Sequence, residues 1–299
     1  MSGERIFLDP KHARRWSFVS HAHADHTPRK VEGEVLYSHA TGRLLRKSIP
    51  GRPLDMNRDF SAGELSMRLL PSGHVLGGSQ LVLENDFKAV YTSDINLDGG
   101  ATCGKAEIEN CDVLIMEATF GMPIFDFPSR KEVVSQIRDW IDDMLSKDTL
   151  PVLLGYSLGK AQELTRYFSR DYQVEVHQTV YENNRKYEQL GIELGRYRLF
   201  PGPERDDRVI IFPPGARGSP LLKGLRCSMA MASGWAVLDG TRGRMKVDEA
   251  FPLSDHSDFQ GLVKYVEKTS PQVVYTFHGF AKDFASELRD RGFYAEPLG

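Results

Sequence analysis

The feature that most constrains this chain is a run of four metal-type side chains within six residues: His21, His23, Asp25 and His26. An apolar segment, 16–20, leads directly into the run and predicts a strand. In extended chain, residues two apart project to the same side, so His21 and His23 can bind one metal ion together. Asp25 and His26 follow where the chain turns and can bind a second ion. The run therefore predicts a metal centre at the end of a strand.

Further metal-type donors follow other predicted strands. Segment 65–70 is followed closely by His74, segment 87–93 ends at Asp94, and the buried-looking segment 273–277 ends at His278. Two ions about 3.5–4 Å apart need a shared ligand, which a carboxylate such as Asp94 can provide. Polar residues just past apolar strands are typical of active sites in layered α/β proteins, because rigid strands fix the loops that follow them.

The middle of the chain has a different sequence pattern, typical of alternating helices and strands. Ser129 and Glu132 form a capping-box pattern, and apolar residues follow at helical spacing. A strand at 150–154, a glycine turn and a helix from Lys160 then predict a small parallel α/β unit. The C-terminal part returns to His- and Asp-rich motifs. This order predicts a core domain interrupted by an insertion.

The motifs resemble those of the metallo-β-lactamase superfamily and, within it, the β-CASP nucleases. The run from His21 to His26, together with Gly73-His74 and Ser93-Asp94, resembles the metal-binding motifs of the superfamily. The β-CASP motifs A, B and C resemble Glu117-Ala118-Thr119-Phe120-Gly121, Leu253-Ser254-Asp255-His256-Ser257-Asp258 and Phe277-His278-Gly279. The resemblance covers nearly the whole chain. Within the family the chain is most similar to DNA ligase-associated exonucleases and archaeal mRNA 3′-end processing factor-like exonucleases.

The resemblance implies an α/β architecture with two domains. The first is a discontinuous metallo-β-lactamase domain of four αββα layers, formed by residues 1–126 and 247–299. The second is an α/β β-CASP domain inserted at 127–246.

The resemblance also implies roles for the polar residues. One zinc ion is held by His21, His23 and His74, and the other by Asp25, His26 and His278, with Asp94 bridging. Manganese is the alternative metal. Asp9 matches an early aspartate of the family and orients a ligand. The catalytic groups implied are Asp25, His256 and Glu117.

The expected chemistry is hydrolysis of a phosphodiester. Two dications activate a water and neutralise a phosphate oxygen. His256 protonates the leaving sugar oxygen, and the carboxylate of Glu117 favours the cationic imidazole. Candidate contacts to flanking phosphates are Ser233, Gly234, Arg242, Arg244 and Lys160 at a helix start. A solvated basic turn is the alternative interpretation of the two arginines.

The function expected is a DNA exonuclease of 5′-to-3′ polarity in DNA repair, with nucleic acid as substrate and DNA-repair, ligase or helicase proteins as partners. A ribonuclease in RNA processing is the main alternative. A small-molecule hydrolase shares the His/Asp run but needs neither the insertion nor the Glu117 and His256 motifs. A non-catalytic nucleic-acid-binding subunit would have lost metal ligands, and all seven are present.

Composition agrees with a cytoplasmic enzyme. Hydrophobic content of 40% and charged content of 26% are ordinary for a globular protein. No stretch approaches the roughly 18 apolar residues of a membrane helix, and the first residues lack the pattern of a secretory signal. The three cysteines include no C-x-x-C spacing. Segment 127–246 is mildly basic, with 19 Lys and Arg against 15 Asp and Glu, which suits phosphate ligands.

Overall fold

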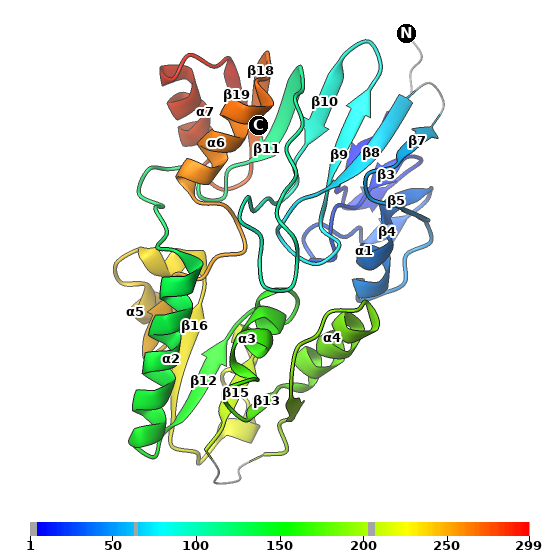
Figure 1. Ribbon diagram of the computed structural model, residues 1–299. Coiled ribbons are helices and arrows are strands. Elements are labelled where there is room, and N and C mark those ends of the chain that lie inside the picture. Colours follow the sequence, from blue (N-terminus) through cyan, green and yellow to red (C-terminus); the bar gives the residue numbers. More distant parts are fainter. Residues whose placement is uncertain (1–4, 63–64, 203–206, 299) are drawn as a thin grey trace. The chain divides into compact units, whose positions relative to one another are not determined.

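The computed structural model describes residues 5–62, 65–202 and 207–298, and its architecture is α/β (Figure 1). The chain divides into two compact units. The first comprises Met1–Asp126 with His256–Gly299, and the second comprises Phe127–Asp255. The second unit therefore extends past residue 246, where the sequence predicted its end. The physical reason is that β17 (Glu249–Phe251) pairs with β16 (Cys227–Ala232) in the sheet of the second unit.

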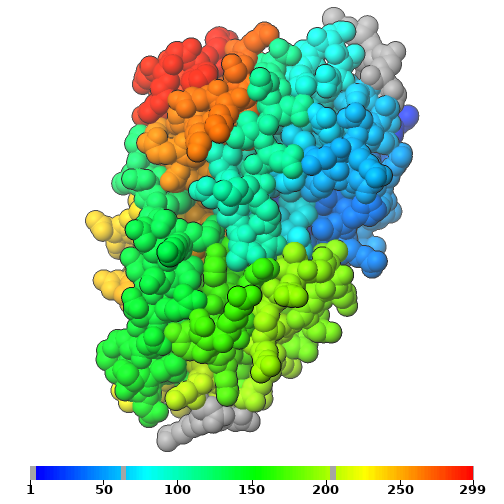
Figure 2. All heavy atoms as spheres, viewed as in Figure 1, coloured from blue at the N-terminus to red at the C-terminus, as the bar shows by residue number. Residues whose placement is uncertain are grey.

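A seven-stranded mixed sheet forms the centre of the first unit. Its strands, in spatial order, are β19 (Ala295–Pro297), β18 (Val273–Phe277), β11 (Val113–Glu117), β10 (Lys88–Tyr91), β9 (Ser79–Glu84), β8 (Leu65–Pro71) and β7 (Asp59–Ala62). Strands β7 to β10 pair antiparallel, whereas β10, β11, β18 and β19 pair parallel. The pairing of β11 with β18 joins the two segments of the first unit, and Figure 2 shows the orange and red C-terminal residues against residues coloured teal.

The two faces of this sheet pack against different layers, as the two-residue period of strands requires. Leu69, Leu81 and Tyr91 pack against Phe18 and Leu36 of a second, parallel sheet. That sheet consists of β1 (Phe7–Leu8), β3 (Ser17–Phe18), β5 (Val35–Ser38) and β6 (Arg52–Leu54). The neighbouring residues of the first sheet, such as Leu70 and Val82, pack instead against the helices α6 (Phe259–Thr269) and α7 (Ala281–Asp290). The smaller elements are α1 (His39–Leu44), β2 (His12–Ala13) and β4 (Lys30–Val31).

The second unit has a six-stranded sheet in which every pairing is parallel. Its order is β14 (Tyr197–Leu199), β13 (Val174–Val176), β15 (Val209–Phe212), β12 (Leu150–Leu154), β16 and β17. The α-helices of the unit are α2 (Arg130–Ser146), α3 (Lys160–Phe168), α4 (Gln178–Gln189) and α5 (Thr241–Met245). Its 3₁₀ helices are η1 (Pro214–Ala216), η2 (Pro220–Leu222) and η3 (Gly234–Val237). The prediction of a parallel α/β unit in the middle of the chain is confirmed.

Local signals placed most elements correctly. The Ser129 side chain accepts the amide of Glu132, and the carboxylate of Glu132 accepts the amide of Ser129, so the predicted capping box starts α2. Asp258 caps α6 by accepting the amide of Gly261. The strand predicted at 16–20 is shorter than expected, because only β3 pairs regularly. No helix in the described ranges is long and apolar enough to cross a membrane.

Candidate metal centre

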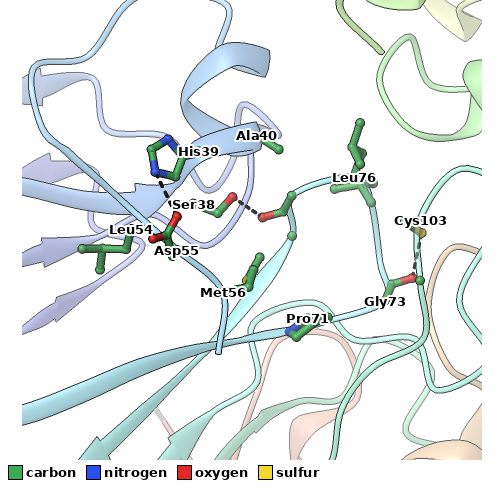
Figure 3. Close-up of a pocket in the computed structure, with 14 residues that line it drawn as sticks. Ser38, His39, Ala40, Leu54, Asp55, Met56, Pro71, Gly73, Leu76 and Cys103 are labelled. Carbon is green, nitrogen blue, oxygen red and sulfur yellow. Dashed lines mark hydrogen bonds and ion pairs between the residues drawn. The ribbon is translucent and has the colours of Figure 1, made fainter. Parts of the chain in front are cut away.

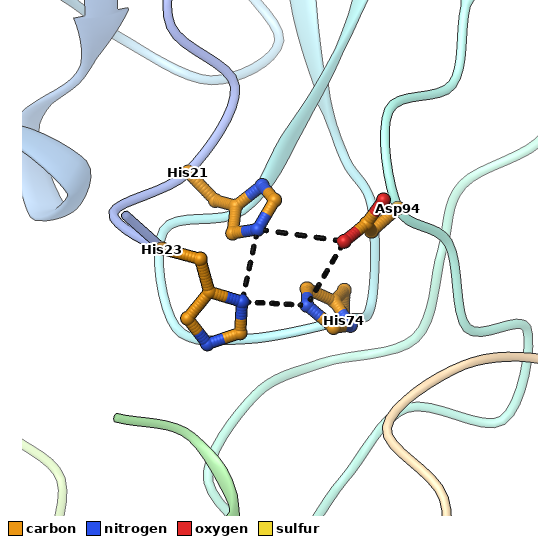
Figure 4. Close-up of side chains that lie close together, drawn as sticks. All are labelled: His21, His23, His74 and Asp94. Carbon is orange, nitrogen blue, oxygen red and sulfur yellow. Dashed lines mark hydrogen bonds and ion pairs between the residues drawn. The ribbon is translucent and has the colours of Figure 1, made fainter. Parts of the chain in front are cut away.

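Four donor side chains converge at the ends of three strands of the first unit. His21, His23, His74 and Asp94 each offer an atom within 4.8 Å of the others (Figure 4). His23 Nδ1 lies 3.0 Å from His21 Nε2 and 3.2 Å from His74 Nε2. Asp94 Oδ2 lies 3.6 Å from His21 Nε2 and 3.5 Å from His74 Nε2. We call these four residues the first donor set.

The first donor set fits a bound cation. Ligands of a tetrahedral zinc ion, at about 2.0–2.1 Å from the metal, lie roughly 3.3 Å from one another. The four separations given above run from 3.0 to 3.6 Å, and all the donor atoms lie within 4.8 Å of one another. Imidazole nitrogens with one carboxylate oxygen are donors that zinc accepts well. His21, His74 and Asp94 are buried, where polar groups need a partner such as an ion.

The remaining predicted ligands form a second, looser donor set of Asp25, His26 and His278. His26 Nε2 lies 3.4 Å from Asp94 Oδ2 and 3.9 Å from Asp25 Oδ2. The His278 ring lies near His26, with centroids 5.7 Å apart. Neither of the two tight donor groups found among the described residues includes a member of this set. The Asp25 side chain is 73% exposed, and His278 is exposed as well. The residues are neighbours, but only His26 is fixed by burial.

Asp9 fixes the orientation of His26. Its carboxylate accepts hydrogen bonds from His26 Nδ1 at 2.8 Å, the Ser20 amide and hydroxyl at 2.8 and 2.6 Å, and the Tyr91 hydroxyl at 2.9 Å. The bond to Nδ1 directs Nε2 towards Asp94. The sequence alone did not single out Ser20, Tyr91 or Ser93. The Ser93 hydroxyl donates to the Ser20 hydroxyl at 2.6 Å. Their position next to the ligands, at strand ends, was the available signal.

The charges of the centre act on one another. Burial alone would lower the pKa of His26, but its hydrogen bond to Asp9 and the charge of Asp94 raise it to about 9. Burial raises the pKa of Asp94 to about 6, against the opposing charge of His256. Burial and the neighbouring imidazoles hold the pKa of His21 well below its usual value. In the metal-free centre His21 is therefore neutral and His26 protonated, so an ion that binds His26 must displace a proton.

Glu117 and His256 form a hydrogen-bonded pair beside the first donor set. His256 Nδ1 lies 2.7 Å from Glu117 Oε1, and both residues lie with Asp94 in a tight donor group. Glu117 is fully buried and also accepts the amides of Ile95 and Thr119. Burial would raise the pKa of Glu117, but the charge and hydrogen bond of His256 lower it. The His256 ring is 4.5 Å from that of His74 between centroids, which brings this pair to the metal centre.

Several residues of the centre have left-handed backbone that no sequence pattern announced. Asp9, Ser93 and His278 have φ of 43°, 54° and 60°. Residues other than glycine rarely adopt such backbone angles, and strained positions of this kind are common at functional sites. Gly73 has φ of 73°, and a Cβ there would lie 2.0 Å from the Asn96 carbonyl oxygen, so only glycine fits before His74.

The predicted phosphate contacts all lie in the second unit. Ser233 caps η3, and Gly234 is buried at its start. Arg242 and Arg244 are exposed on α5, where Arg242 lies 3.5 Å from Glu249. Lys160 differs from the prediction, because it is buried and its ammonium group contacts two carboxylates. The Lys160 charge is therefore paired with carboxylates of the protein itself and is not exposed to a ligand.

A pocket of about 340 Å³ lies beside the loop that carries His74 (Figure 3). Gly73 and Val75, on either side of His74 in sequence, belong to its lining. The Ser38 hydroxyl donates to the Gly77 carbonyl at 2.6 Å and ties the loop to the start of α1. The pocket wall thus supports the position of His74.

Comparison with known proteins identifies the family. No protein-family model matches the chain. A probable DNA ligase of Opitutus terrae is 36% identical over 302 residues, which cover 98% of this chain and 30% of that protein. The metal and A, B and C motifs lie within this matched region. The chain belongs to the β-CASP metallo-β-lactamase family.

Two other relatives of this β-CASP protein carry different names. An RNase J-like protein of Methanocaldococcus jannaschii is 32% identical over 103 residues, covering 33% of this chain and 24% of that protein. The 5′ exonuclease Apollo of Danio rerio is 25% identical over 305 residues, covering 92% of this chain and 50% of Apollo. The β-CASP chain therefore spans half or less of each of these relatives.

Proposed function

We propose that this β-CASP protein is a metal-dependent nuclease that hydrolyses phosphodiester bonds, and that it is a DNA exonuclease of 5′-to-3′ polarity. The observation that carries the proposal is the position of Asp94. Its carboxylate belongs both to the first donor set and to the group formed with Glu117 and His256. A cation centre and a candidate proton donor therefore meet at one carboxylate, which is what cleavage of a phosphodiester requires.

Two finer structural assignments belong to the same proposal. The first unit would have four αββα layers, with α1 completing the outer layer next to the second sheet. The second unit would be the β-CASP domain, with its C-terminal boundary at Asp255 instead of the predicted 246. The packing of the two sheets of the first unit against each other, with α6 and α7 on the other face of the larger sheet, supports the first assignment. The parallel six-stranded sheet and the return of the chain at His256 support the second.

The seven predicted ligands would hold two divalent cations, zinc first and manganese as the alternative. His21, His23 and His74 would hold one ion and Asp25, His26 and His278 the other, with Asp94 between them. When bound, the ions supply an ionised water at neutral pH and neutralise charge on the phosphate. Asp9 would keep the His26 ring oriented for binding.

His256 would act as the general acid. As the water oxygen bonds to phosphorus, the bond from phosphorus to the leaving sugar oxygen breaks, and that oxygen takes a proton from His256 Nε2. Solvent then restores the proton. Glu117 accepts a hydrogen bond from His256 Nδ1 and stabilises the cationic form of the imidazole, which is the form able to donate a proton. Because Glu117 is itself held by two backbone amides, the imidazole is fixed in one orientation.

The choice of DNA rests on the relative named a probable DNA ligase, and the choice of a 5′-to-3′ exonuclease on the relative named 5′ exonuclease Apollo. Ribonuclease activity is the second candidate, and the similarity to an RNase J-like protein favours it. Arg242, Arg244, Ser233 and Gly234 remain proposed contacts to phosphate. Partners in DNA repair, such as a ligase or helicase, and a cytoplasmic location complete the proposal.

The test uses oligonucleotides labelled at either end, single- and double-stranded, as DNA and as RNA, with Zn²⁺, Mn²⁺ or Mg²⁺. We expect mononucleotides to be released from the 5′ end of DNA. Preferred cleavage of RNA would replace the first candidate with the second. Hydrolysis of thioesters or lactams without cleavage of either nucleic acid would reject the nuclease proposal.

A further inference from the structure

Four charged side chains form a partly buried cluster in the second unit, around the residue that precedes His256. We call them the charge cluster: Arg130, Lys160, Glu163 and Asp255. The Lys160 ammonium contacts the Asp255 carboxylate and lies 3.1 Å from Glu163 Oε2. Arg130 Nη1 lies 2.8 Å from Glu163 Oε1, and Arg130 Nη2 donates to the Ser254 carbonyl at 2.8 Å. The cluster therefore holds Asp255 by its side chain and Ser254 by its backbone.

Because these charges are largely removed from water, each needs a well-placed partner of opposite charge. The side chains of Lys160 and Glu163 are 2% and 3% exposed, and that of Asp255 is 12% exposed. Charges removed from water are tolerated only when they are paired and well placed. With two cations and two anions the cluster is balanced, so displacing Asp255 would leave the Lys160 charge poorly compensated. The cluster consequently restricts Asp255 to one position.

The restriction matters because the next residue is the proposed general acid. The chain passes from the second unit to the first between Asp255 and His256. His256 is held through its ring by Glu117. Consecutive Cα atoms are about 3.8 Å apart, so the position of Asp255 limits where the backbone of His256 can lie. We propose that Lys160 and Arg130 are positioning residues for His256, an inference that rests on the proposed function.

The expected effect is specific to proton transfer. A general acid works only within hydrogen-bond reach of the oxygen that it protonates. A misplacement of about 1 Å can slow a reaction roughly 10²-fold. A sugar oxygen needs the proton to leave, whereas p-nitrophenolate leaves without one. Loss of positioning should therefore slow DNA cleavage and spare a p-nitrophenyl ester.

The experiment compares DNA with the p-nitrophenyl ester of thymidine 5′-phosphate, using the full chain loaded with zinc. The variants are K160M and K160M/D255N. The double variant stays balanced because Arg130 and Glu163 remain a pair, so it tests the idea even where K160M alone is unstable. The matched control is R208M, which breaks a fully buried ion pair with Glu175 in the same unit. H256A supplies the reference pattern.

We expect K160M/D255N to lower kcat on DNA about 10²-fold, with KM and zinc content unchanged and the ester rate within about threefold of wild type. R208M should keep both rates per folded molecule. An equal loss on both substrates, or no loss on DNA, would overturn the positioning role. Hydrogen exchange of 253–258 provides a readout that needs no catalysis, and exchange no faster than in wild type would also overturn it. Absence of wild-type cleavage of either substrate would instead reject the proposed function.

Discussion

The two donor sets differ in how firmly the fold holds them. The first set is mostly buried, and its ring nitrogens already stand 3.0 and 3.2 Å apart. In the second set only His26 is buried, whereas Asp25 and His278 are exposed. The strand ends themselves therefore place the donors of the first set close together. The donors of the second set would have to move closer together to hold an ion.

The largest effect is expected where the two sets meet. Asp94→Ala removes the carboxylate that lies near His21, His74 and His26, so both ions should be lost. Cleavage should fall at least about 10⁴-fold, because each ion supplies several kcal/mol of stabilisation in the transition state. Turnover and metal content are measured together. The control is Asp98→Ala, an exposed carboxylate four residues away, which should behave as wild type. Full activity of Asp94→Ala would refute the bridging role.

A smaller effect is expected within the second set. Asp25→Ala should retain the ion of the first set and lose the other, with cleavage reduced roughly 10²- to 10³-fold. Metal analysis after mild chelation distinguishes one retained ion from none. Asp86→Ala, another exposed carboxylate, serves as the control. Loss of both ions from Asp25→Ala would contradict the difference between the sets.

The metal-free protein should show the raised pKa of His26 in its pH dependence. Between the unfolded pKa of about 6.5 and the folded value of about 9, the folded state binds the extra proton. The stabilisation is therefore complete below about pH 6.5 and is lost as pH rises to about 9, by up to about 3 kcal/mol. Urea unfolding with chelator at pH 6 and pH 9 measures it. Asp9→Asn should flatten the trend, and an unchanged trend would exclude Asp9 as its cause.

The smallest change concerns the orientation of a ligand rather than its presence. Asp9→Asn should weaken binding of the second ion about 10- to 100-fold, while the first set keeps its ion. Calorimetric titration of the metal-free protein separates the two binding steps. Tyr91→Phe removes only one of the other bonds to Asp9 and is the milder companion variant. Equal weakening of both steps would mean that Asp9 supports the whole centre.

The sequence predicted the parts of the molecule that local chemistry determines. A capping box fixes the start of α2, and the apolar run 150–154 forms β12 at the predicted bounds. The compact unit continues to Asp255, past the predicted boundary at 246, because strand pairing of Glu249–Phe251 depends on a partner distant in sequence. No local pattern contains that information.

The candidate site divides in the same way. The spacing of His21 and His23 indicated a shared ion, and the structure brings them together. The burial of Lys160 could not be read from its glycine turn, which looked like a phosphate-binding helix start. Its partners, Asp255 and Glu163, come from different segments and meet it only in the folded chain.

We propose that seven side chains hold two cations on either side of Asp94. Anomalous diffraction at the zinc edge from crystals of the zinc-loaded protein tests it directly. We predict two peaks about 3.5–4 Å apart, one among His21, His23 and His74 and the other next to His26 and His278. A single peak, or a second peak away from His26, would contradict the account.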